Sequence, residues 1–107
     1  MDESKYQLLA DATFRRIDDG FRDTDPDVVE CERSGDVLTL TMPGRVRCVV
    51  NTQRVTRQVW VAAKAQAWHF NYEEATGRWL SDKTPSVELF ETLRRIVREN
   101  ASVDISF

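Results

Sequence analysis

The chain has little of what holds the smallest proteins together or binds a cofactor. Its two cysteines are too few for the disulfide framework of a secreted mini-protein. Four glycines and three prolines exclude collagen and low-complexity disorder. The single histidine, His69, excludes a multi-histidine metal site, and neither a Gly-rich phosphate loop nor a Cys-x-x-Cys pair is present. No apolar run approaches the ~20 residues that a membrane-spanning helix needs.

The composition that remains is that of one globular domain. The chain has 107 residues, 41% hydrophobic and 31% charged, which predicts a single domain over residues 1–107. A chain of this size buries a core without metal or disulfide support. The N-terminal segment Met1–Lys5 lacks the basic and apolar regions of a secretory signal and is too acidic for a mitochondrial transit peptide. With so few cysteines, the expected location is a reducing cytoplasm.

The net charge of −3 is unevenly distributed. Residues 1–32 contain ten acids and four bases and carry −6, whereas residues 33–107 contain eight acids and eleven bases and carry +3. An acidic first third argues against nucleic acid and anionic membranes as partners. It favours cations or a basic protein surface.

Two segments have the periodicity of amphipathic helices. Apolar residues recur at steps of three and four over residues 4–22, which predicts a helix capped by Ser4 or Asp2. A second helix is predicted to start with Thr84 as its cap and Pro85 at its first position, and to end near residue 100.

Between these helices the apolar period changes to two, and Gly or Pro turns separate the runs. Strands are expected around residues 28–32, 37–42, 45–51, 58–63, 68–72 and 79. Short turns between successive strands make an antiparallel meander with one apolar face. The predicted fold is therefore α+β, a two-layer sandwich with two helices packed on one face of an antiparallel sheet of five to six strands.

Seven acids and one base lie between residues 18 and 32. We name these acids the acidic ridge: Asp18, Asp19, Asp23, Asp25, Asp27, Glu30 and Glu32. Their hard oxygen ligands suit iron, manganese, calcium or magnesium. Because the spacing differs from that of a Ca²⁺ loop, a metal site here is expected to be shallow and hydrated, with a dissociation constant on the order of 10⁻⁵–10⁻³ M. The alternative is a solvated acidic face without metal.

Charge pairing within the first helix divides this ridge. Asp18 stands four residues before Arg22, so an ion pair between them is expected. Asp19 and Asp23 have the same spacing but like charge, and no base lies near them in the sequence. We expect a bound cation to relieve their repulsion.

A second candidate surface lies on the sheet face away from the helices. Strand parity places Arg47, Asn51, Trp60 and His69 there, with Gln53 just past a strand end. A tryptophan on such a face contributes about 2 kcal/mol or more when a partner buries it. The alternatives are a loop of the same chain covering the tryptophan, and a histidine with no specific role.

The two cysteines, Cys31 and Cys48, are predicted to face the core as small packing residues. They lie on the first and third expected strands, about 9.6 Å apart in a regular sheet. That separation exceeds the reach of a disulfide.

The order of these motifs resembles the signature of the frataxin family, in its bacterial, CyaY-like form. The matching residues are Asn51-Thr-Gln53, Gln58-Val-Trp60-Val-Ala-Ala-Lys64, Trp68-His69-Phe70 and Trp79. The acidic first helix, the Cys-Glu strand, the segment from Gly35 to Thr41 and the C-terminal helix follow in the same order. The resemblance thus covers essentially the whole chain.

The resemblance implies an iron-binding protein of iron–sulfur cluster assembly. Family members bind Fe²⁺ and Fe³⁺ weakly, and other divalent cations are possible ligands. The seven carboxylates of the acidic ridge are the implied iron ligands. The implied partners are a cysteine desulfurase and the iron–sulfur scaffold, which would contact the ridge and the residues Asn51, Gln53, Trp60 and His69. The protein would regulate the desulfurase or supply iron as a monomer, with an iron-dependent oligomer as the alternative.

Three departures from the family pattern stand out. Arg22 replaces an acid usual in bacterial relatives, the acidic loop is one residue short and contains Pro26, and Ala65-Gln66-Ala67 stands where glycines are frequent. Two other functions remain open. One is a ferroxidase, an enzyme that needs two irons bridged by its ligands. The other is an acidic docking module without physiological metal. The main expectation is a protein without enzymatic activity.

Overall fold

The computed structural model describes all residues, 1–107, and contains two helices and six strands. The helices are α1 (Glu3–Gly20) and α2 (Leu89–Ala101). The strands are β1 (Glu30–Ser34), β2 (Val37–Met42), β3 (Val46–Gln53), β4 (Gln58–Ala63), β5 (Gln66–Glu73) and β6 (Arg78–Ser81). A 3₁₀ turn, η1 (Pro43–Arg45), connects β2 to β3.

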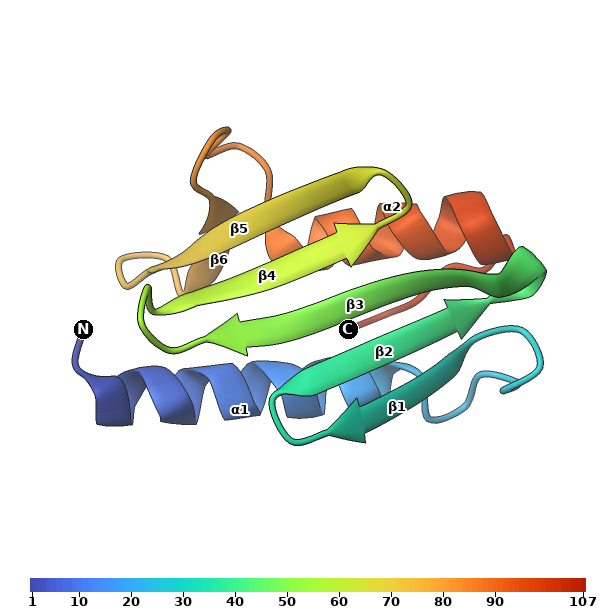
Figure 1. Cartoon of the computed structure of the whole chain (residues 1–107), viewed down its shortest axis with the longest axis horizontal. Helices are drawn as coiled ribbons and strands as arrows, with labels where there is room; N and C mark the ends of the chain where they lie inside the picture. The colour runs from blue at the N-terminus through green and yellow to red at the C-terminus, as the bar shows by residue number, and fades with distance from the viewer.

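The strands form one antiparallel sheet in the order β1-β2-β3-β4-β5-β6. Both helices cover the same face of this sheet, and the other face is open (Figure 1). Twenty-two buried residues form one core cluster between the layers. Because the alternating strand pattern supplies one apolar face and each helix supplies one apolar stripe, a two-layer sandwich results. The predicted fold class is confirmed.

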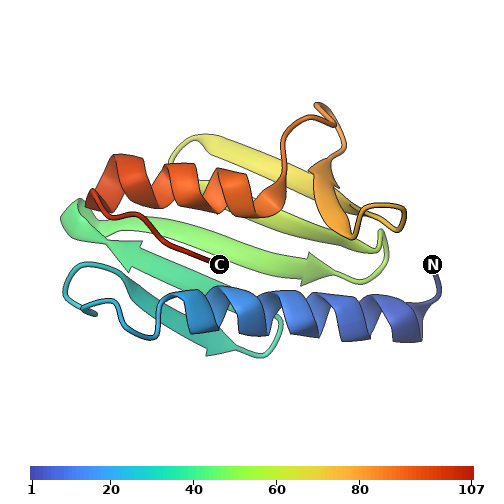
Figure 2. The same cartoon turned by 180° about the vertical axis from the view of Figure 1, so that it is seen from behind.

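Helix α1 begins as the sequence predicts and ends two residues early. The Asp2 carboxylate accepts a hydrogen bond from the Lys5 amide at 2.8 Å, which confirms one of the two expected caps. The helix ends at Gly20, and Phe21 follows in a non-helical conformation. The C-terminal tail packs here, running between the two helices (Figure 2). A Cβ atom at Gly20 would lie 2.7 Å from the Phe107 ring, so glycine makes room for this aromatic.

The predicted start of the second helix is wrong. The N-cap of α2 is Glu88, whose carboxylate accepts hydrogen bonds from the Phe90 and Glu91 amides, both at 3.0 Å. Residues 84–87 instead form a turn in which Val87 donates to the Thr84 carbonyl. The Val87 carbonyl then accepts from Ser81 at the end of β6. The segment before Glu88 thus completes the sheet edge, and the helix starts only after it.

Two further boundaries matter for function. Gln53 is the last residue of β3 rather than a residue beyond the strand, so it keeps the parity of Asn51. The acidic loop extends to residue 29, so β1 begins with Glu30. Both helices lack the long, uncharged apolar stretch that a membrane-spanning helix requires.

Candidate functional site

The acidic ridge lies where the end of α1, the following loop and β1 meet at one edge of the sandwich (Figure 1). All seven carboxylates are exposed. Two buried residues of the loop, Phe21 and Val29, anchor it to the core on either side of the acids. The fold therefore gathers the acids at one edge and leaves them in water.

The loop between α1 and β1 is held by Asp25. Its carboxylate accepts from the Asp27 amide at 2.9 Å, and its carbonyl accepts from Val28 at 2.9 Å and Val29 at 3.1 Å. Aspartate favours such turns because its short side chain bonds to the backbone two residues ahead. This interaction fixes the loop and leaves the Asp27 carboxylate directed to solvent.

The predicted Asp18–Arg22 ion pair is wrong. Arg22 pairs with Asp19 at 2.5 Å, because the helix ends at Gly20 and Arg22 no longer holds the helical position four residues after Asp18. Asp19 therefore does have a basic neighbour. The Asp18 carboxylate instead faces β1, where the Cys31 thiol donates to it at 3.5 Å.

Glu30 and Glu32 are neighbouring like charges within the ridge. They lie on the same face of β1, where hydrogen bonding to the Glu32 carboxyl group and then its negative charge raise the pKa of Glu30 above its ordinary value of 4.5, with Asp27 adding to the effect. At neutral pH both carboxyl groups are ionised and repel each other, and protonation of one of them removes this repulsion. A cation offers the same relief without lowering the pH.

The ridge does not form a preorganised metal centre. No three histidine, cysteine or acidic side chains converge in a geometry that would hold an ion. Burial raises the pKa of both thiols to about 12, with Asp18 contributing for Cys31, so neither supplies a thiolate at neutral pH. The donor set is thus carboxylate oxygen and water, which fits a loosely held hard cation.

The structure brings together most of the residues predicted on the open sheet face. Asn51, Trp60 and His69 occupy one row across β3, β4 and β5. The Trp60 and His69 rings stack at 4.1 Å with an interplanar angle of 16°. The imidazole, rather than a loop, therefore covers one side of the half-buried indole.

Two residues that the sequence reasoning missed hold this pair in place. Gln58 accepts from the Trp60 indole at 2.9 Å and donates to Asn71 at 3.0 Å and to Asp82 at 3.4 Å. Asp82 lies 3.6 Å from the Nδ1 atom of His69. We call Gln58, Trp60, His69, Asn71 and Asp82 the tryptophan platform. Gln58 shares the strand parity of Trp60, so the sequence pattern could have placed it on the open sheet face. Asp82 follows β6, and no sequence pattern places it there.

Of the remaining predicted residues, Gln53 borders the platform and Arg47 does not. Gln53 pairs with Gln58 in the register of β3 and β4, and its amide donates to the Tyr6 hydroxyl at 3.0 Å. Arg47 lies at the other end of β3, opposite Thr41. The platform lies on the central strands and the acidic ridge at the β1 edge, so the two are separate surfaces (Figure 1).

Comparisons with known proteins agree with this architecture. A model of the frataxin-like domain matches residues 1–103. The chain is 34% identical over 107 residues to the iron–sulfur cluster assembly protein CyaY of Pseudomonas fluorescens Pf0-1, covering all of this chain and 96% of that protein. It is 35% identical to the CyaY protein of Pseudomonas aeruginosa, covering all of this chain and 97% of the relative.

Solved structures share the fold. Frataxin from Psychromonas ingrahamii superposes with a TM-score of 0.89 at 24% identity, covering 99% of this chain and 97% of that chain. Trimeric yeast frataxin complexed with ferrous iron superposes with a TM-score of 0.69 at 24% identity, covering 96% and 88%. The family model and the relatives of full-length similarity agree, and the chain therefore belongs to the frataxin-like family.

Proposed function

We propose that this protein takes part in iron–sulfur cluster assembly by holding iron loosely on the acidic ridge and docking on the cysteine desulfurase and the scaffold. The observation that carries the proposal is the group of seven exposed carboxylates at the end of α1, in the following loop and on β1. A surface with this unrelieved repulsion attracts Fe²⁺, Fe³⁺ or a basic protein face.

The lack of a preorganised cage supports transfer rather than storage of iron. Exposed carboxylates bind a hydrated cation with little ligand rearrangement, so release costs little free energy. The same charges steer a basic partner and raise its association rate. Iron and the partner would therefore compete for, or share, the same carboxylates.

The tryptophan platform is the proposed second contact. Its ring is half-buried and its orientation is fixed by Gln58 and His69, so docking would order few additional rotamers. We assign Asn51, Gln53, Trp60 and His69 to partner binding. The ridge would supply steering and the platform would supply the geometric fit.

A triple charge reversal tests the shared use of the ridge. Asp19→Lys, Asp23→Lys and Glu30→Lys together are expected to weaken desulfurase binding and Fe²⁺ binding in parallel, measured by calorimetry under anaerobic conditions. The control variant carries the same change in net charge on the α2 side. It replaces Glu91, Glu99 and Asp104 with lysine. Undiminished desulfurase binding by the ridge variant would refute the shared-ridge proposal.

The ferroxidase alternative has no observation in its favour. His69 stacks on Trp60 across the sheet face and is not part of the ridge, which leaves carboxylates alone to bridge two irons. An oxygen-consumption assay with Fe²⁺ that showed catalytic turnover would reverse this conclusion. The docking module without metal is distinguished by the same calorimetric titration, in which it predicts no heat of Fe²⁺ binding.

A further inference from the structure

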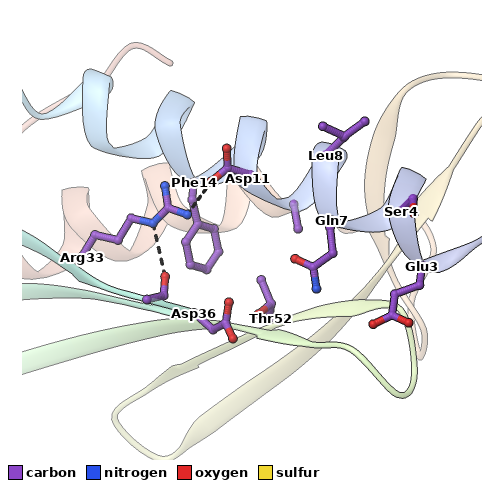
Figure 3. A pocket seen from close by; sticks show the side chains of 11 residues that line it. Glu3, Ser4, Gln7, Leu8, Asp11, Phe14, Arg33, Asp36 and Thr52 are labelled. Carbon is purple, nitrogen blue, oxygen red and sulfur yellow. Dashed lines mark hydrogen bonds and ion pairs between the residues drawn. The ribbon is translucent and has the colours of Figure 1, made fainter.

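The largest concave surface of the protein is not part of the acidic ridge or the tryptophan platform. A groove of about 830 Å³ runs between the N-terminal half of α1 and the turn that joins β1 to β2 (Figure 3). No residue of the acidic ridge lines it. Along α1, the groove residue Asp11 and the ridge residue Asp19 are about 12 Å apart, at 1.5 Å per residue. The groove and the ridge therefore occupy different parts of α1, and each includes residues of β1.

One end of the groove is closed by a fixed arginine. The Arg33 guanidinium donates to Asp11 at 2.6 Å and to the Gly35 carbonyl at 3.3 Å, and it lies 5.2 Å above the Phe14 ring (Figure 3). The same contact lowers the pKa of Asp11. This charge is therefore neutralised locally, and the arginine is a wall of the groove rather than a site for anions.

The rest of the groove combines apolar surface with unpaired polar groups. Leu8 is 73% exposed on the rim, directed away from the sheet, while Gln7 and the Phe14 ring are directed toward it (Figure 3). The side chains of Gln7 and Asp36 make no hydrogen bond or ion pair within the protein, although the Asp36 carbonyl accepts from the Thr52 amide at 3.1 Å. The hairpin thus contributes an exposed carboxylate to the groove, and α1 contributes an exposed leucine on its outer rim.

These features determine the kind of ligand that fits. Three carboxylates line the groove, those of Glu3, Asp11 and Asp36, against one guanidinium. Asp11 pairs with Arg33 and Glu3 with Arg54, so Asp36 provides the uncompensated charge. A lysine or arginine suits this surface, since its apolar stem can lie along the groove while its charged end reaches the carboxylate.

We propose that this groove binds an extended basic segment of the same protein partner that docks on the acidic ridge. A basic side chain of such a segment would reach Asp36 inside the groove, and a neighbouring apolar side chain would cover Leu8 on the rim. The groove continues the ridge surface along α1. It adds sequence selectivity to a ridge that recognises charge alone. This inference rests on the proposed function, because the partner is the protein that we propose docks on the acidic ridge.

Two titrations test the proposal with the whole protein. The double variant Leu8→Ser and Asp36→Lys is expected to bind the cysteine desulfurase about tenfold more weakly, as expected when a buried anchor and a charge pair are lost. Its anaerobic Fe²⁺ titration is expected to match the wild type. The control is Val55→Ser with Glu99→Lys, which removes an apolar side chain that is 92% exposed and reverses one acid elsewhere. Thermal unfolding checks that both variants fold.

Amide NMR with a blocked peptide of sequence Lys-Ser-Leu-Ser-Lys locates the contact. Shifts confined to Gln7, Leu8, Asp36 and Thr52, absent with Glu-Ser-Leu-Ser-Glu, support the proposal. Unchanged desulfurase affinity of the groove variant would overturn it, even if the ridge variant binds weakly and the proposed function stands. Weakened binding by the groove variant with an unaffected ridge variant would instead refute the ridge as the docking surface.

Discussion

The acidic ridge and the tryptophan platform differ in how firmly the rest of the protein holds their side chains. The ridge has seven exposed carboxylates and few fixed contacts, and the Glu32 carboxylate raises the pKa of Glu30. In the platform, Gln58 and Asp82 hold the stacked rings of Trp60 and His69 through hydrogen bonds and close polar contacts. The proposed roles follow from this difference: the ridge would recognise a partner by summed charge, and the platform by shape.

This difference has consequences for how each surface tolerates change. Charge interactions in water are long-ranged, screened by salt and spread over many residues, so one substitution removes only part of the effect. A stacked and hydrogen-bonded ring depends on each contact. The platform should thus be sensitive to single substitutions and insensitive to salt, and the ridge the reverse.

The largest effect is expected from removing the central ring. Trp60→Ala should weaken partner binding by about 2 kcal/mol, or about 30-fold, because it removes an anchor with a fixed orientation. Calorimetry with the desulfurase and, separately, with the scaffold identifies which protein contacts the platform. Arg47→Ala, on the same face at the far end of β3, serves as the control. Wild-type affinity of Trp60→Ala for both proteins would remove the platform from the docking surface.

A smaller effect is expected from salt. Between 0.1 M and 1 M ionic strength the Debye length falls from about 10 Å to about 3 Å, so exposed charges lose most of their reach. Desulfurase affinity should fall about tenfold for the wild type and for Trp60→Ala alike. The triple ridge reversal should lose this dependence. Equal salt slopes for the ridge variant and the wild type would show that the ridge does not steer binding.

A third substitution separates the ring from its support. Gln58→Leu removes the acceptor of the Trp60 indole and should cost about 1 kcal/mol in stability, with about a fivefold loss of partner affinity. The indole N–H of Trp60 should then exchange faster with solvent by NMR. Unchanged exchange and affinity would mean that stacking on His69 alone fixes the ring.

The smallest effect is a pH dependence of the ridge. Because the pKa of Glu30 is raised above 4.5 in the folded state, this group destabilises the fold at neutral pH and the effect disappears as the pH falls through the raised pKa. Glu30→Gln should therefore raise the melting temperature near pH 7, and the gain should shrink toward about pH 4.5. Asp104→Asn, outside the ridge, is the comparison. A gain that grew on acidification would contradict the assigned repulsion.

The sequence predicted the features that depend on local pattern. Alternation placed Asn51, Trp60 and His69 on one face, and the register of β3, β4 and β5 puts them in one row. The apolar faces of the helices and the Asp2 cap could also be predicted, because periodicity and capping depend only on residues close in the sequence.

The errors arose where tertiary structure overrides local preference. Thr84 and Pro85 have the composition of a helix start, yet this segment is used to complete the β6 edge, and Glu88 caps α2 instead. Arg22 was expected to pair with Asp18, but the helix ends before the spacing applies. Asp82 and the groove at Asp36 depend on elements distant in sequence, so no local pattern revealed them.

The most direct test of the central claim is an anaerobic Fe²⁺ titration followed by amide NMR. If the acidic ridge holds iron, signals between Asp18 and Glu32 should broaden first, while those of Trp60 and His69 remain sharp. Broadening centred on the platform, or the absence of any localised change, would contradict an iron-binding ridge.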